Sequence, residues 1–94
     1  MLVAGLGVLG VLGEDHPDTL HSASNLAADL RALGEHERAR QLDEDTLTRR
    51  RRVLGEDHPD TLLSAGNLTA DLRALGEYER ADQLEEHVRS HRRS

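Results

Sequence analysis

The decapeptide VLGEDHPDTL occurs twice in this chain of 94 residues, at positions 11–20 and 53–62. The two copies lie 42 residues apart, and aligning residues 11–52 with residues 53–94 gives 12 differences and 30 identities. Self-similarity at a fixed period of about 20–50 residues is typical of proteins that stack one structural unit on the next. The sequence therefore predicts two stacked repeats, 11–52 and 53–94, preceded by a leader of residues 1–10.

Each repeat has the apolar periodicity of helices. Steps of three and four residues predict a first helix with one buried face. Its apolar positions are Leu20, Ala23, Leu26, Ala27, Leu30 and Leu33 in the first repeat, and Leu62, Ala65, Leu68, Thr69, Leu72 and Leu75 in the second. Gly34 and Gly76 follow, and Gly is common just past a helix end. Pro17 and Pro59 suit the first helical position, with Asp15 or His16 as the cap in the first repeat.

A second helix is expected to begin near Glu35 and Glu77. Its apolar positions are sparser: Ala39, Leu42, Thr46 and Val53 in the first repeat, and Ala81, Leu84 and Val88 in the second. No segment has the pattern of a strand. The predicted fold class is all-α, with tandem helix-turn-helix hairpins that form two repeats of an α-solenoid. Such a hairpin cannot bury both of its faces alone, so it stacks on a neighbour.

The joint pattern resembles the tetratricopeptide repeat family. The family's positions are matched by Leu26-Ala27, Leu30, Gly34 and Ala39, and in the second repeat by Leu68-Thr69, Leu72, Gly76 and Ala81. Tyr78 fits the aromatic residue after the turn. The usual period of 34 residues is lengthened to 42 here, which resembles the kinesin-light-chain-like subclass also found in bacterial multidomain regulators. The chain departs from the family at Asp43 and Glu85, where a large residue is usual.

The resemblance implies that the first helices line a concave face that binds peptides. On that face we expect the candidate groove residues His21, Ser24, Asn25, Ala28, Arg31, Leu63, Asn67, Ala70 and Arg73. An Asn side chain can donate to and accept from a peptide backbone, and Arg can hold a carboxylate with two hydrogen bonds. The alternative is that the Asn side chains bridge the hairpins and that Arg31 and Arg73 pair with Asp29 or Asp71.

Catalytic and cofactor chemistry finds no support in the sequence. Cysteine and lysine are absent, which excludes thiolate chemistry and a phosphate loop of the usual pattern. His87 and His91 share a helix face, but the Glu of a His-Glu-x-x-His zinc motif is missing between them. We interpret this pair as a solvated helix end, and we expect no enzyme activity, no cofactor and no metal.

The charge and the leader bear on partners and location. The net charge of −6 disfavours nucleic acid as a partner. The leader is apolar but lacks the basic start of a signal peptide and the roughly 20 apolar residues of a membrane span. It is interpreted as the edge of a truncated or artificially extended sequence. Neither a membrane partner nor export is expected, and the predicted location is the cytoplasm.

The predicted function is that of a protein-binding or peptide-binding scaffold, part of a longer array. Solenoids need about three or more repeats and polar terminal repeats, and this chain has neither. We therefore expect a homo-oligomer formed through the exposed repeat ends. The alternative function is a structural spacer or self-associating arm of a signalling ATPase or regulator, without a ligand of its own.

Overall fold

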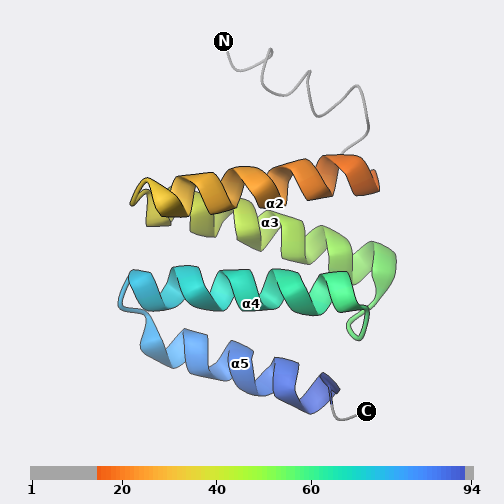
Figure 1. The fold of residues 1–94 in the computed structure, drawn as a ribbon. Coiled ribbons are helices and arrows are strands. Elements are labelled where there is room, and N and C mark those ends of the chain that lie inside the picture. The colour runs from red at the N-terminus through yellow and green to blue at the C-terminus, as the bar shows by residue number, and fades with distance from the viewer. Residues whose placement is uncertain (1–14, 93–94) are drawn as a thin grey trace.

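A computed structural model describes residues 15–92, which form four α-helices and no strand. The helices are α2 (Pro17–Ala32), α3 (His36–Leu54), α4 (Pro59–Ala74) and α5 (Tyr78–Arg92). Helices α2 and α4 run in one direction and α3 and α5 in the other, so two antiparallel hairpins stack on each other (Figure 1). This confirms the predicted all-α fold of two helical hairpins. The predicted leader of residues 1–10 lies outside the described residues.

The start of each hairpin is fixed by its His-Pro pair. His16 and His58 have extended backbone, and each Nδ1 accepts a hydrogen bond of 3.0 Å from the backbone N–H of Asp18 or Asp60. This bond satisfies one of the amide donors that a helix start leaves without a partner. His16 is therefore the residue that caps α2, rather than Asp15.

We expect the His58→Ala substitution to lower the free energy of unfolding by about 0.5–2 kcal/mol, the usual cost of removing a capping side chain. The His58→Asn substitution keeps a capping acceptor and is expected to retain most of the stability. Urea unfolding followed by circular dichroism measures both. Equal losses in the two variants would show that the imidazole does not act as the cap.

Each hairpin turns at a glycine with left-handed backbone. Gly34 has φ of 83° and Gly76 has φ of 81°, a region that disfavours residues with a Cβ atom. The backbone N–H of Glu35 donates to the carbonyl of Leu30 at 2.8 Å, and that of Gly34 to Arg31 at 3.0 Å. This pair of bonds is a Schellman motif, which ends the helix and reverses the chain.

The larger core cluster lies where the hairpins meet. Leu47 of α3 packs with residues of α4 and α5 in a cluster that consists of Leu47, Ala65, Leu68, Leu72, Ala81 and Val88. A smaller cluster of Ala27, Leu30 and Ala39, with Leu42 packed against it, holds the first hairpin together. The second repeat therefore gains burial from the first repeat, whereas the first repeat has no described hairpin before it.

Some predicted core positions are exposed. Leu26 is 52% exposed although its counterpart Leu68 is only 5% exposed. The difference arises because Leu68 packs in the cluster that contains Leu47 of the preceding helix, and no described helix offers Leu26 such a neighbour. Leu33 and Val53 are also exposed, because they lie where the helices end.

Candidate functional site

Two parallel first helices present an outward stripe of side chains. His21, Asn25 and Ala28 of α2 are exposed and spaced by four and three residues, so they share one helix face. On α4 the equivalent positions hold Leu63, which is 57% exposed, and the exposed Ala70. His21 and Asn25 make no hydrogen bond to another side chain within residues 15–92. These side chains are therefore available to a partner.

The remaining groove candidates lie nearer the contact between the two hairpins, where α2 and α3 meet α4. We call this contact the seam. Asn67 Nδ2 donates to Ser24 Oγ at 3.4 Å, so this Asn bridges α4 and α2. Arg31 is engaged by two carboxylates, and Arg73 donates to Asp82 and Glu85. These residues carry intramolecular bonds. Asn67 and Arg31 bond as the alternative interpretation described, whereas Arg73 pairs with Asp82 and Glu85 and not with Asp29 or Asp71.

The seam is built around a buried ionic triad of Arg31, Asp43 and Asp71. Arg31 Nη1 donates to Asp43 Oδ2 and to Asp71 Oδ1, both at 2.8 Å. The exposed fractions of the three side chains are 22%, 2% and 0%. Because Arg31 belongs to α2, Asp43 to α3 and Asp71 to α4, a single guanidinium joins the first hairpin to the second. Asp43 occupies the position where the family has a large residue, and Arg31 supplies its charge balance.

One cation does not balance two buried carboxylates. Burial raises the pKa of Asp43 to about 7, and the hydrogen bond and charge of Asp71 add to this rise, while Arg31 opposes it. Oδ2 of Asp71 is buried without a hydrogen-bond partner among the described residues. A proton on Asp43 would remove the excess negative charge beside Asp71.

Other polar bonds complete the seam. Arg50 Nη1 donates to Ser64 Oγ at 2.7 Å and to the carbonyl of Asp60 at 3.3 Å. Thr61 Oγ1 donates to the carbonyl of Arg50 at 3.3 Å. Arg50, Thr61 and Ser64 are buried, so these bonds satisfy polar side chains that water hardly reaches. The seam is therefore specified by position-matched polar contacts as well as by apolar packing.

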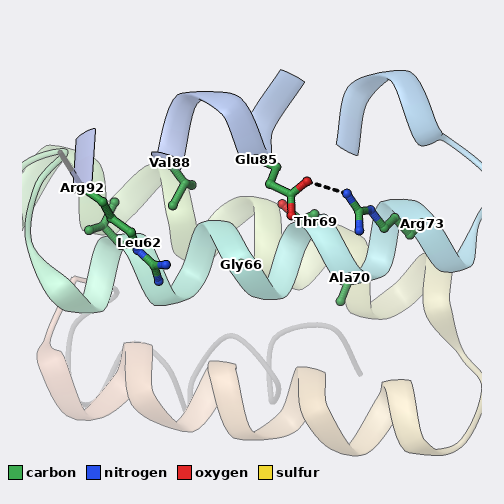
Figure 2. A pocket seen from close by; sticks show the side chains of 8 residues that line it. All are labelled: Leu62, Gly66, Thr69, Ala70, Arg73, Glu85, Val88 and Arg92. Carbon is green, nitrogen blue, oxygen red and sulfur yellow. Dashed lines mark hydrogen bonds and ion pairs between the residues drawn. The ribbon is translucent and has the colours of Figure 1, made fainter. Parts of the chain in front are cut away.

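The far end of the second hairpin repeats this arrangement, but no further helix covers it within residues 15–92. A groove of about 370 Å³ between α4 and α5 is lined by Leu62, Gly66, Thr69, Ala70, Arg73, Glu85, Val88 and Arg92 (Figure 2). Arg73 Nη2 donates to Glu85 Oε1 at 2.6 Å across it, and these two side chains are 44% and 47% exposed. Arg73 and Glu85 correspond to Arg31 and Asp43, so this groove is the part of the seam that α4 covers in the first repeat.

The opposite end presents the complementary surface. Asp29 is the counterpart of Asp71, yet Asp29 is exposed and makes no ion pair within the described residues. Leu26 and Ser22, the counterparts of Leu68 and Ser64, are exposed beside it. Thr19 Oγ1 is buried without a described partner, whereas its counterpart Thr61 bonds to Arg50. One end of the module thus offers the acidic half of the seam, and the other end the basic half.

Stacked helical hairpins with a repeated seam define a tandem α-helical repeat protein. A family profile described as "Tetratricopeptide repeat" matches residues 19–60 and 61–93. The chain belongs to the tetratricopeptide repeat family, as the sequence pattern indicated. No curated protein matches the chain.

Solved structures support the subclass. The chain is similar to the crystal structure of a Podosopora anserina putative kinesin light chain with nearly identical TPR-like repeats, and to the structure of a point variant of that protein. In each comparison the TM-score is 0.76 and the identity 30%, over 87% of this chain and 39% of that chain. This chain therefore spans about two fifths of the length of those structures. The predicted likeness to kinesin-light-chain-like repeats is confirmed.

Repeats of this family mediate interactions between proteins and serve as non-catalytic scaffolds. Among residues 15–92, no helix is both long and apolar enough to cross a bilayer.

Proposed function

We propose that the chain binds a protein segment along the outward stripe of α2 and α4. The observation that supports this best is the pairing of exposed apolar and unbonded polar groups on that stripe. Leu63 offers an apolar contact, while His21 and Asn25 offer hydrogen bonds that no described side chain takes. Peptide-binding surfaces combine apolar area with a few polar groups that fix orientation.

Peptides selected from a displayed random library on the immobilised chain would test this surface. We expect the Asn25→Ala and Leu63→Ser substitutions each to weaken the selected peptides by about tenfold, because each removes a contact of about 1–2 kcal/mol. Gln83→Ala is the matched control, because Gln83 is exposed on α5 and lies beside another groove. Unchanged affinity in both stripe variants, with unchanged helicity, would favour the structural alternative.

The second candidate function is self-association, in which the open ends of two copies stack head to tail. The groove of Figure 2 retains Arg73 and Arg92, the counterparts of Arg31 and Arg50. The exposed end of α2 retains Ser22 and Asp29, the counterparts of the residues those arginines bind. Stacking would pair charges of opposite sign, which favours correct docking.

The apolar part of such a contact is smaller than that of the internal seam. Leu47 of α3 is replaced on α5 by Arg89, which lies near Glu85 and Glu86. We therefore expect weak association that depends on salt concentration. Sedimentation velocity is expected to show a species larger than the monomer at tens of micromolar, and a monomer across that range would exclude this candidate.

A further inference from the structure

Glu56, His87 and His91 come together where the connector between the hairpins passes the end of α5. One potential ligand atom of each residue lies within 4.8 Å of the other two. Glu56 Oε1 is 3.2 Å from His87 Nε2, and the two imidazole rings have centroids 4.2 Å apart. All three side chains are at least partly exposed, so an ion can reach them from solvent. The sequence pattern pairs the two histidines but offers no third ligand.

The tautomer of His91 suits a ligand. His91 Nδ1 lies 2.9 Å from the backbone carbonyl of His87. Because a carbonyl can only accept, Nδ1 must donate its hydrogen, which leaves the lone pair on Nε2. A backbone carbonyl that holds the other ring nitrogen is the usual support of a histidine that ligates a metal.

The first repeat does not carry this cluster on its second helix. The positions of His87 and His91 hold Asp45 and Arg49 there, and Arg49 Nε donates to Asp45 Oδ2 at 2.8 Å. These two positions are among the 12 at which the repeats differ. The change from an ion pair to two imidazoles beside a carboxylate therefore belongs to the second repeat.

We propose that Glu56, His87 and His91 bind a zinc ion through two imidazole nitrogens and one carboxylate oxygen, with water at the fourth position. Imidazole and carboxylate ligands suit zinc, whose bonds of about 2.0–2.2 Å place tetrahedral ligands about 3.3 Å apart. The ligand atoms now lie within 4.8 Å of one another, so these partly exposed side chains would rotate to reach that spacing when the ion binds. Arg51 Nε also donates to Glu56 Oε1 at 3.1 Å, and this nearby cation limits the affinity. The bound ion would tie the connector between the hairpins to α5.

Titration of zinc chloride into the tag-free chain tests the proposal. We expect one ion per chain and a rise in Tm of about 5 °C or more at ten times Kd, because the ion binds the folded chain. Magnesium chloride should cause no rise, because Mg²⁺ prefers six oxygen ligands. The absence of a zinc-dependent rise, or a ratio of one ion to two chains, would overturn the proposed site.

Variants separate a zinc site from general effects of the metal. The double substitution His87→Asp with His91→Arg copies the ion pair of the first repeat, so helicity should persist while the zinc response disappears. Glu56→Gln should weaken zinc binding by about tenfold or more. His16→Asn removes an imidazole outside the cluster, retains a helix cap, and should keep the full response. A response that survives the double substitution, or full affinity in Glu56→Gln, would contradict the three-ligand site.

Discussion

Replacing Arg31 with alanine is expected to lower the free energy of unfolding by about 3–5 kcal/mol, because removing one partner of a buried ion pair leaves charge without compensation. Here two carboxylates lose their common cation, and both are almost completely buried. A domain of this size is stabilised by about 5–15 kcal/mol, so the variant should be largely unfolded at low urea concentrations. Urea unfolding at pH 7.5, followed by circular dichroism, measures the loss.

Arg73→Ala is the matched control, because Arg73 occupies the same position in the second repeat. Its partners Glu85 and Asp82 are 47% and 74% exposed, and exposed ion pairs contribute about 0–1 kcal/mol. We expect a loss of no more than about 1 kcal/mol in this variant. If both substitutions destabilised the chain equally, the buried triad would not be what holds the seam.

The second large effect is an unusual dependence of stability on pH. Burial, together with the neighbouring Asp71, raises the pKa of Asp43 in the folded chain from the ordinary 3.8 to about 7. The folded state therefore holds the proton more tightly than the unfolded state. The stability that this proton contributes is fully present below about pH 4 and is lost as the pH rises to about 7.

Asp43→Asn imitates the protonated side chain at every pH. We expect this variant to match the wild type near pH 4 and to exceed its stability at pH 8 by on the order of 3 kcal/mol, the size that a shift of this extent implies. Urea unfolding of both proteins from pH 4 to pH 8.5 gives the difference, in which carboxyl groups away from the triad cancel. A difference that does not change with pH, or a variant less stable at pH 8, would contradict the raised pKa.

The sequence was sufficient to predict the fold of the described helices. The 42-residue period shows that one unit is repeated. Within each hairpin, local chemistry determines where the helices begin and end, through the His-Pro starts and the glycines at 34 and 76. Burial was predicted less well, because it depends on neighbouring hairpins. Leu26 and Leu68 occupy equivalent repeat positions, yet only Leu68 has a described helix packed on it. Leu47 was not predicted from the sequence as a core residue, although it lies in the larger core cluster.

The candidate sites differ in the same way: features within one helix were predictable, whereas contacts between helices were not. The resemblance implied the stripe on the first helices, and helical spacing put His21, Asn25 and Ala28 on one face of α2. The triad of Arg31, Asp43 and Asp71 brings together three helices. The sequence suggested only that the arginines could pair with Asp29 or Asp71, without Asp43. Asp43 could have been suspected, because it places a charge where the family has a large residue. Glu56 lies 31 residues before His87, so no local spacing connects it with the two histidines.

The central claim is that the open ends retain the two halves of the seam, with Asp29 at one end and Arg73 at the other. Asp29→Arg and Arg73→Asp each place like charges at both faces of a head-to-tail contact, so neither variant should associate alone. An equimolar mixture restores complementary contacts in both orders, because the new arginine faces the new aspartate and the native Arg73 of one variant faces the native Asp29 of the other. Sedimentation velocity of the mixture is the most direct measurement. The account predicts two monomeric variants that associate with each other when mixed. A mixture that stays monomeric, or single variants that associate as the wild type does, would contradict it.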